Sequence, residues 1–250
     1  MEGTPGPKVI AVRDPDPIKS KNPPLHPHLP QVDGFGGGAL VLLISPVRTG
    51  KSTLISNMLL NDQFYDGQNR FDNTTIISNT ISNDITSRFL RKAFDTIDHY
   101  DDSIIDGIVN TQKSYPKEEQ PDIAVVLDDC LGSIRREAKI NHLASRFRHF
   151  NIKLLIISSQ NFRMCSPIIR QNATNVIIGS PFPNQKELGK VAEEYGDSFG
   201  GADNFLKIYA QATPNRYDFL HLDFQSNPPK AYRNFETLIA EGSKILNSAE

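Results

Sequence analysis

The sequence predicts an α/β domain with a mainly parallel sheet and helices on both faces. Two observations lead to this expectation: short apolar runs recur along the chain, and stretches with helical spacing separate them. Continuous apolar runs are typical of parallel strands buried on both faces, and the intervening helices supply the covering layers. The chain has 250 residues and is 38% hydrophobic, so it can bury one sizeable core but not two large ones.

Strands and helices are expected to alternate along the chain up to residue 178. Strands are expected where apolar and β-branched residues run together, at residues 39–44, 74–78, 123–127, 153–158 and 175–178. Helices are expected where apolar side chains recur every three or four positions, at residues 51–60, 84–100 and 134–150. This alternation is what a parallel sheet with crossover helices requires.

The pattern changes after Gly200. Residues 205–210 and 217–224 flank a turn-forming sequence at 213–216, which predicts a β-hairpin. Residues 231–246 predict a closing helix. Its inward-facing apolar residues are Phe235, Leu238, Ile239 and Leu246. The expected fold is therefore a mainly parallel α/β sheet followed by a C-terminal β-hairpin and helix.

The first 38 residues form a separate region. Eight of the chain's 17 prolines fall before residue 31, and three glycines at 36–38 close the stretch. Proline fixes φ and cannot donate a backbone hydrogen bond, so we expect an extended arm at 1–38 and a single domain at 39–250. Two interpretations stay open: a disordered tail, or an arm that lies on a neighbouring subunit or partner. His26 and His28 have no third ligand nearby, so no metal is expected there.

Composition excludes several classes of protein. The net charge of −2 gives no global basicity, and two cysteines do not indicate a disulfide-stabilised scaffold. The longest apolar run, 39–44, is much shorter than the ~20 residues of a membrane helix. The N-terminus has no basic start followed by an apolar stretch, so no secretion signal is expected. We therefore expect a soluble intracellular protein without a membrane partner.

A phosphate-binding loop is predicted between the first strand and the first helix. Residues 45–52 match G-x-x-x-x-G-K-[ST] at every fixed position except the first, where Ser45 replaces glycine. Such a P-loop turns its backbone N–H groups around the phosphates of ATP, and the glycine at position 50 allows close approach. Lys51 is expected to reach the β and γ phosphates, and the Ser52 hydroxyl to bind Mg²⁺. The expected nucleotide-binding residues are Ser45, Pro46, Val47, Arg48, Thr49, Gly50, Lys51, Ser52 and Thr53.

Two carboxylates follow the strand at 123–127. Buried strands rarely end in two acids without a cation to neutralise them. Asp128 is expected to hold Mg²⁺, directly or through water, together with Ser52. Asp129 is expected to polarise the attacking water, a role that glutamate takes more often.

A polar side chain, Gln160, follows the strand at 153–158. The carboxyl ends of parallel strands are where α/β sheets bind ligands. Gln160 is therefore a candidate to contact the γ-phosphate or the water. Residues 129–132 fit the D-x-x-G pattern of GTPase switch loops, but no N-K-x-D motif follows to read guanine, which favours ATP.

Taken together, these motifs resemble those of viral DNA-packaging ATPases of the poxvirus, giant-virus and virophage type, a branch of the FtsK–HerA superfamily. The resemblance runs from about residue 40 to residue 224. It rests on the P-loop, on Asp128-Asp129 in place of Asp-Glu, and on the sequence at 148–172. That sequence carries Arg148-His149 before the strand, Gln160 at its end and Ile169-Arg170-Gln171-Asn172 after it. The departures are Ser45, and Arg48 where the superfamily often has glycine.

The resemblance implies a fold of the additional-strand, catalytic-glutamate (ASCE, RecA-like) P-loop type. It also implies an ATPase, stimulated by DNA, that works as a homo-oligomeric ring of five or six subunits. Such a ring pushes double-stranded DNA of any sequence into a preformed capsid, next to a capsid or portal protein. The host cytoplasm or viral factory, or the virion itself, is the location that this implies.

Charge is distributed unevenly along the chain. Residues 131–170 contain eight lysines or arginines and one acid, whereas residues 95–129 contain ten acids and two lysines. The basic segment is expected to meet phosphates of DNA or of a neighbour's ATP. Arg148 is the preferred candidate for an arginine that acts on the neighbouring subunit's ATP, with Arg146 and Arg170 behind it. The alternative is that two solvated helices of opposite charge pack together.

Other functions stay open at this stage. A nucleoside or nucleotide kinase also has a P-loop and several arginines, but it requires a phosphate acceptor. A cellular or plasmid DNA-pumping ATPase of the same superfamily usually carries further DNA-binding or membrane domains. A non-catalytic ATP-dependent scaffold does not need a carboxylate such as Asp129.

Overall fold

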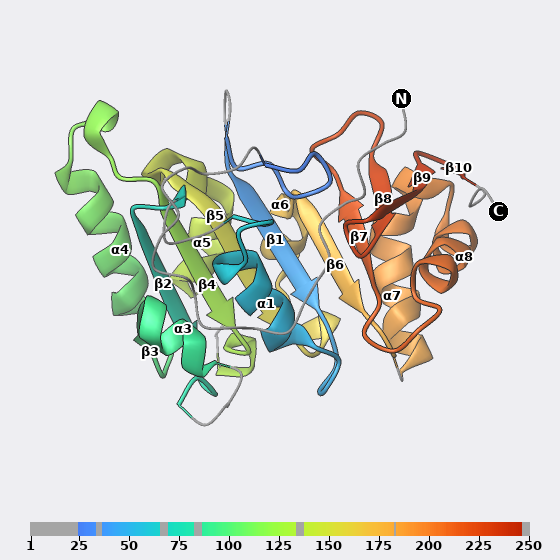
Figure 1. Cartoon of the computed structure of the whole chain (residues 1–250), viewed down its shortest axis with the longest axis horizontal. Coiled ribbons are helices and arrows are strands. Elements are labelled where there is room, and N and C mark those ends of the chain that lie inside the picture. The colour runs from blue at the N-terminus through green and yellow to red at the C-terminus, as the bar shows by residue number, and fades with distance from the viewer. Residues whose placement is uncertain are drawn as a thin grey trace.

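A computed structural model of the chain describes residues 25–33, 37–65, 70–82, 87–133, 138–182 and 184–246. One sheet of ten strands runs through this described part, in the order β10-β9-β8-β7-β6-β1-β5-β4-β2-β3. Helices cover both of its faces (Figure 1). The α/β class predicted from the sequence is therefore confirmed.

Six of these strands form a parallel half. They are β1 (Ala39–Ile44), β2 (Asn73–Ser78), β3 (Asp95–Ile97), β4 (Ile123–Asp128), β5 (Ile152–Ser159) and β6 (Asn175–Gly179). The first strand, β1, lies between β5 and β6 and is completely buried. All five predicted strands lie in this half, which shows that continuous apolar runs were a reliable signal for buried parallel strands.

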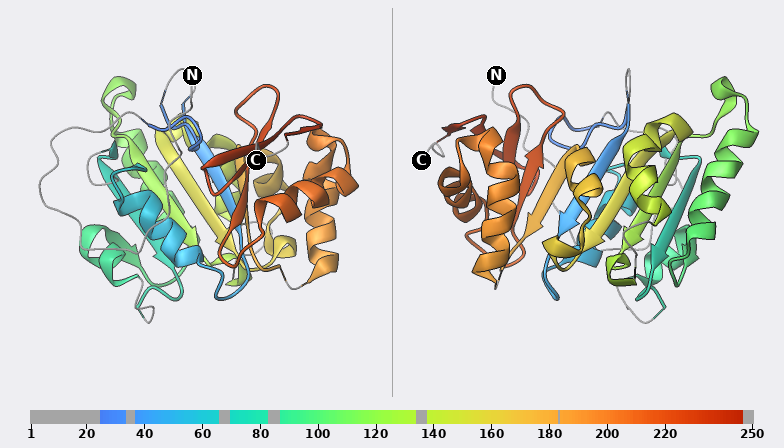
Figure 2. Two further views of the ribbon diagram at one scale, coloured as in Figure 1. Left: turned by 45° about the vertical axis from the view of Figure 1, so that its right-hand side comes forward. Right: turned by 180° about the vertical axis from the view of Figure 1, so that it is seen from behind.

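The helices divide between the two faces of the sheet, as the two views in Figure 2 show. Ala39, Val41 and Leu43 pack on the face covered by α1 (Lys51–Leu60) and α3 (Arg88–Ala93). The alternate residues of β1 pack on the opposite face. That face is covered by α4 (Asp102–Ser114), α5 (Lys139–Arg146), α6 (Pro167–Asn172), α7 (Gln185–Tyr195) and α8 (Ala202–Ala212). A strand that is apolar at every position is thus explained by two covered faces.

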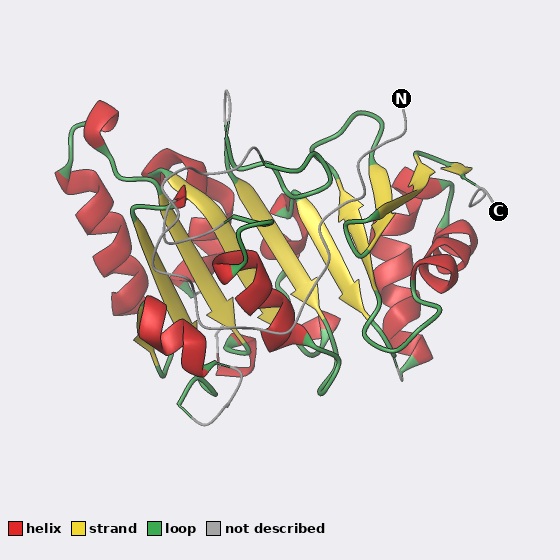
Figure 3. Ribbon diagram, in the orientation of Figure 1, coloured by secondary structure: helices red, strands yellow, loops and turns green. Residues whose placement is uncertain are grey.

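The C-terminal half of the sheet is antiparallel (Figure 3). Its strands are β7 (Phe219–Asp223), β8 (Lys230–Arg233), β9 (Thr237–Glu241) and β10 (Lys244–Ile245), and β7 pairs with β6. The closing helix predicted at 231–246 is wrong. Asn234 and Phe235 have φ of 53° and 64°, and Gly242 has φ of 55°. These left-handed residues turn the chain between strands and would interrupt a helix.

The hairpin predicted from residues 205–210 and 217–224 is also wrong in its first half. Residues 205–210 lie in α8, where Phe205, Ile208, Tyr209 and Ala212 are buried at helical spacing. The second half contains β7, but this strand pairs with β6 and β8. The helices α4, α6, α7 and α8 were not predicted from the sequence.

Two further helices are shorter than expected. In place of one helix at 84–100, the structure has α3, which ends at Ala93, and then strand β3. Phe94 is in an extended conformation and ends the helix. In place of one helix at 134–150, the structure has α5 and a 3₁₀ turn at Phe147–Phe150. Residues 84–86 and 134–137 lie outside the described residues.

The described part of the N-terminal region packs on the domain itself. Leu29 and Val32 are buried, and the Tyr65 hydroxyl donates to the Pro30 carbonyl at 2.8 Å. His28 Nδ1 lies 2.8 Å from the Phe235 carbonyl oxygen. Residues 25–33 therefore pack against the domain, and residues 1–24 lie outside the described part. None of the helices described is long and apolar enough to cross a membrane.

Candidate active site

The predicted site residues meet at the carboxyl edge of the parallel half. The P-loop follows β1, Asp128 ends β4 and Gln160 follows β5. The strand register pairs Ile44 with Ser159 and Asp128 with Ser158, so the three strand ends lie level with one another. The Ser45 amide donates to the Ser159 carbonyl at 3.0 Å and joins the start of the loop to β5. The sheet therefore assembles the site from three separate motifs.

The loop turns sharply through two left-handed residues. Arg48 has φ of 62° and Gly50 has φ of 89°. Thr49 Oγ1 donates to the Pro46 carbonyl at 2.6 Å and closes the turn between them. Arg48 thus takes the backbone conformation that the resemblance associates with glycine, at a cost of roughly 1–2 kcal/mol. The departure at position 48 leaves the turn in place.

Ser45 is accommodated by a glycine on the neighbouring strand. A Cβ added at Gly179 would lie 2.1 Å from Ser45 Oγ and 2.9 Å from Ser45 Cβ. The Ser45 hydroxyl also contacts the Thr49 hydroxyl across the base of the loop. Ser45 is buried, so the serine that replaces the usual glycine fills the space left by Gly179.

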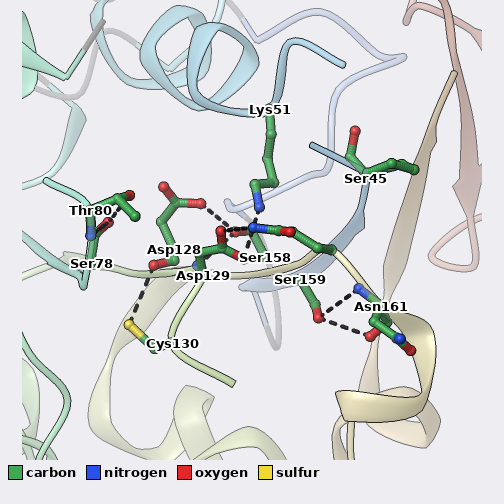
Figure 4. A network of polar contacts seen from close by, with 12 residues as sticks. Ser45, Lys51, Ser78, Thr80, Asp128, Asp129, Cys130, Ser158, Ser159 and Asn161 are labelled. Carbon is green, nitrogen blue, oxygen red and sulfur yellow. Dashed lines mark hydrogen bonds and ion pairs between the residues drawn. The ribbon is translucent and has the colours of Figure 1, made fainter. Parts of the chain in front are cut away.

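Lys51, Asp129 and Gln160 contact one another at the mouth of the loop. Lys51 Nζ lies 3.0 Å from Asp129 Oδ1, with side chains 10% and 20% exposed. The Gln160 side-chain amide donates to the other oxygen of Asp129. Lys51 Nζ is buried and has no hydrogen-bond partner among the described residues beyond this ion pair. Figure 4 shows Lys51 pointing from α1 towards Asp129. The ammonium has donor capacity left for an anionic group in the cleft.

Asp128 lies deeper than Asp129. It is 6% exposed, and its carboxylate accepts a hydrogen bond from the Ser158 hydroxyl. Asp129 turns away from β4 through a left-handed backbone, with φ of 58°, and its amide donates to Ser158 Oγ at 3.2 Å. The next residue, Cys130, is no nucleophile at neutral pH, because burial raises the pKa of its thiol to about 12. The two acids are therefore placed differently, one in the strand and one facing the cleft.

The cleft has a volume of about 780 Å³, within the range of small-molecule sites. It is lined by P-loop residues 45–53 and by Asp129, Gln160, Gly179, Arg216 and Tyr217, among others. Its chemistry fits a polyphosphate: backbone N–H groups at a helix start and one buried ammonium. Among the described residues no three His, Cys, Asp or Glu side chains cluster in a metal site. A Mg²⁺ ion here fits a set of one carboxylate, the Ser52 hydroxyl, waters and phosphate oxygens.

Comparisons with known proteins found a sequence relative and several solved structures with a similar fold. No family model matches the chain. Uncharacterized protein 075L of Invertebrate iridescent virus 6 is 28% identical over 205 residues, which are 78% of this chain and 74% of that protein. B204, the DNA-packaging ATPase of Sulfolobus Turreted Icosahedral Virus, matches with a TM-score of 0.57 at 18% identity, over 79% of this chain and 98% of B204. The B204 genome-packaging NTPase of Sulfolobus turreted icosahedral virus 2, in complex with ATP-γS, matches with a TM-score of 0.54 at 18% identity, over 78% and 96% of the two chains.

The chain has the fold of the B204 packaging ATPases. The P-loop ATPase fold that the resemblance implies is thereby confirmed. The strand order of the sheet explains why Asp129 and Gln160, which are 31 residues apart, lie in contact. Their strands β4 and β5 are neighbours in the sheet although a helical crossover separates them in sequence.

Within this fold, the structure does not bring the candidate arginines to the cleft. Arg148 donates through Nε to the Gly38 carbonyl at 3.2 Å, just before β1 begins. The P-loop starts at the other end of this six-residue strand, about 20 Å away. Arg170 pairs with Glu194 at 3.0 Å, and Arg146 is exposed at the end of α5. Arg148 is therefore too far from its own P-loop to contact a nucleotide there.

The charged segments pair partly with each other. Lys139 forms an ion pair with Asp106 of α4, and Lys153 lies 3.5 Å from Asp122. Arg163 and Arg170 pair with glutamates on α7. The packing of oppositely charged elements thus accounts for part of the charge pattern. Arg146 and Arg148 form no ion pair with any acid among the described residues.

Among the cleft residues that sequence reasoning missed are an arginine and a tyrosine. Arg216 and Tyr217 line the cleft from the loop between α8 and β7. The sequence at 213–216 predicted a turn, but it did not indicate that this turn would lie beside the P-loop cleft. Its position follows from the antiparallel pairing of β7 with β6, which returns the chain to the carboxyl edge of the parallel half.

Proposed function

We propose that this chain is an ATP-hydrolysing motor that moves double-stranded DNA into a viral capsid. The observation that carries the proposal is the contact of Lys51, Asp129 and Gln160 at a P-loop, in a chain with the B204 fold. The iridescent-virus relative supports a viral setting. The host cytoplasm or viral factory, or the virion, is the proposed location.

In the proposed mechanism each residue has one role. Backbone N–H groups of the P-loop and of the start of α1 bind the phosphates. Lys51 exchanges its ion pair with Asp129 for the β and γ phosphates. Asp129, once released, orients a water and takes its proton as the water oxygen attacks the γ-phosphorus and the bond to the bridging oxygen breaks. Gln160, which is hydrogen-bonded to Asp129, couples the presence or loss of the γ-phosphate to the end of β5.

Ser52 and Asp128 are the proposed Mg²⁺ ligands. Ser52 lies in the first turn of α1 and lines the cleft, while Asp128 ends β4. Mg²⁺ held by these residues would neutralise charge on the phosphates. The Ser158 hydroxyl donates to the Asp128 carboxylate and fixes its orientation at the end of β4.

The proposed assembly is a homo-oligomeric ring of five or six subunits, next to a capsid or portal protein. Arg148 is about 20 Å from its own P-loop, so a catalytic role for it requires the neighbouring subunit. A supplied arginine is worth ~10³–10⁵ in rate in well-studied phosphoryl-transfer enzymes. DNA contacts go to phosphates, because packaging accepts any sequence.

The first test measures ATP hydrolysis with and without double-stranded DNA of two unrelated sequences at fixed salt, together with the mass in solution. The proposal expects stimulation by both DNAs and a ring-sized particle. Turnover that requires a phosphate acceptor and ignores DNA supports a nucleotide kinase instead.

The second test separates the two acids. Asp129→Asn is expected to bind ATP-Mg²⁺ and lose hydrolysis, whereas Asp128→Asn is expected to lose Mg²⁺-dependent affinity. The opposite pattern would exchange their roles.

A third test concerns Arg148. Arg148→Ala and Lys51→Ala proteins, each inactive alone, are expected to regain some ATPase activity when mixed in verified rings. Full activity of Arg148→Ala alone would remove this arginine from the mechanism.

A further inference from the structure

We propose that Tyr217 is the surface on which the base of the bound nucleotide stacks, with Arg216 supporting the ring. The inference rests on the proposed function to the extent that the cleft takes a nucleoside triphosphate. It adds how the base is held and which class of nucleotide is accepted.

The cleft has two chemically different ends. Lys51, Asp129 and Gln160 mark the end where the terminal phosphates bind. Arg216 and Tyr217 line the same cleft from the loop before β7. Tyr217 also lies beside the turn of the P-loop, because a Cβ added at Gly50 would lie 3.6 Å from Tyr217 Cδ1. A nucleotide with its phosphates at Lys51 has its ribose and base left to place in the remaining part of the cleft.

Tyr217 is an unusual side chain for a loop surface. It is 56% exposed although it is one of the large hydrophobic residues, and its backbone is left-handed with φ of 75°. Left-handed backbone at a bulky residue costs free energy and persists only where the surroundings fix it. Strain of this kind is concentrated at ligand-binding sites.

The loop around Tyr217 is held by the buried carboxylate of Asp218. Its oxygens accept hydrogen bonds from the Asn215 amide at 2.9 Å, the Arg233 guanidinium at 3.0 Å and the Asn234 side chain at 2.7 Å. The Tyr217 amide donates to the Ser180 carbonyl at 3.4 Å, next to the end of β6. These contacts tie the loop to both β6 and β8, so the ring is presented from a rigid support.

The chemistry of the pair fits a base and does not read its identity. The Arg216 guanidinium lies 4.9 Å from the Tyr217 ring centroid, in the geometry of a cation–π contact. The side chain is still 56% exposed, so ring surface remains for a base. Every base has a π face, so stacking tolerates different bases. The expected substrates are therefore nucleoside triphosphates, with little discrimination between adenine, guanine and the other bases.

The test compares ADP with inorganic tripolyphosphate, which has phosphates but no base, by calorimetry on the full chain. Tyr217→Ala is expected to weaken ADP binding by about 5- to 150-fold, the range that a stacked base accounts for. It is expected to leave tripolyphosphate binding unchanged. Tyr217→Phe, which keeps the ring, is the matched control and is expected to bind ADP like wild type. Tyr217→Gly relieves the left-handed backbone and is expected to lose as much ADP affinity as Tyr217→Ala.

Several outcomes overturn the inference. Unchanged ADP affinity in Tyr217→Ala excludes stacking, and an equal loss of tripolyphosphate affinity assigns Tyr217 to loop structure alone. Full affinity in Tyr217→Gly with a loss in Tyr217→Ala assigns the effect to backbone strain. Wild-type protein that binds neither ligand overturns both this inference and the proposed function. If ADP binding depends on the aromatic ring of Tyr217 but DNA does not stimulate the ATPase, the stacking surface is retained and the proposed motor function is overturned.

Discussion

The parallel and antiparallel halves of the sheet use their polar side chains differently. In the parallel half, Lys51, Asp129 and Gln160 stand at the carboxyl edge and face a cleft. In the antiparallel half, polar groups are enclosed and bond to one another. His221 is completely buried, with Nε2 3.2 Å from Asn175 Nδ2, and Asn175 also donates to Asp223 at 3.3 Å. Lys51, Asp129 and Gln160 of the parallel half thus face a ligand site, whereas His221 and Asp223 of the antiparallel half bond to Asn175 and hold β7 to β6.

This difference predicts two classes of variant. Changes at the carboxyl edge are expected to alter turnover with little effect on folding. Changes inside the antiparallel half are expected to alter folding, and turnover only as a result. The predictions below either break this division or sharpen it.

The largest effect is expected from Lys51→Ala. The lysine charge stabilises the phosphates most strongly in the transition state, so its loss is expected to lower ATP turnover by roughly 10²–10³-fold or more. A steady-state phosphate-release assay measures this. Lys244→Ala, an exposed lysine of β10 in the antiparallel half, is the matched control and is expected to retain wild-type turnover. Near-normal hydrolysis by Lys51→Ala would remove the P-loop assignment.

The second effect is expected where the two halves meet, at Gly179. Gly179→Ala places a methyl group 2.9 Å from Ser45 Cβ, so the loop must shift, at a cost of about 1–3 kcal/mol. Nucleotide affinity and the unfolding free energy should both fall. The double variant Gly179→Ala with Ser45→Gly removes the clash and is expected to recover much of both quantities. Additive losses in the double-mutant cycle would contradict the packing of Ser45 against Gly179.

The third effect is on stability against pH and belongs to the antiparallel half. Burial lowers the pKa of His221 to about 3, and burial also lowers the pKa of His28. Between pH 6.5 and 3 the unfolded chain therefore binds protons that the folded chain does not. The stabilisation is complete above pH 6.5 and falls on acidification, by roughly 1.4 kcal/mol per pH unit for one histidine.

Denaturant unfolding at pH 7 and pH 5 measures this dependence. His221→Gln is expected to reduce the slope of the unfolding free energy against pH by roughly 1.4 kcal/mol per pH unit, the contribution of one histidine. His142→Gln changes an exposed histidine on α5 and serves as the control, with the wild-type dependence expected. An unchanged slope in His221→Gln would show that another group is responsible.

The smallest effect is expected at Arg48, where the P-loop backbone is left-handed. Arg48→Gly removes the steric cost of this conformation and is expected to raise the unfolding free energy by about 1 kcal/mol. Lys207→Gly is the opposite control, because glycine inside α8 is expected to lower it by about 1 kcal/mol. Thermal unfolding of both variants measures the two shifts. Destabilisation by Arg48→Gly would mean that the arginine side chain contributes contacts to the loop.

The two halves also differed in how much the sequence could predict. In the parallel half, five of the six strands are apolar or β-branched runs, and polar motifs follow β1, β4 and β5; both signals are local. The exception is β3, Asp95–Ile97, which was placed in a predicted helix. In the antiparallel half, the strands are short, and their boundaries depend on left-handed residues such as Asn234 and Phe235 that no local pattern marked. Phe205 and Ile208 were assigned to a strand because their neighbours are also apolar, although their burial follows a helix. In both the C-terminal strands and the 205–210 segment, packing against residues distant in sequence determined the secondary structure.

Local sequence signals predicted most of the candidate site, and the part that depends on pairing between distant strands was missed. Lys51, Asp128, Asp129 and Gln160 follow predicted strands, and parallel strands end at one edge. Tyr217 and Arg216 could not be placed, because their position depends on β7 running antiparallel to β6.

The central position of β1 has a consequence for the order of folding. β1 pairs with β5 and β6, so Ala39 contacts Leu154 and Val41 contacts Asn175. The sheet therefore cannot close around its first strand until more than a hundred further residues have been synthesised. Until then a strand apolar on both faces must be shielded from water and from other chains. Such distant pairings slow folding, so an unpaired β1 is exposed to aggregation until β5 and β6 are available.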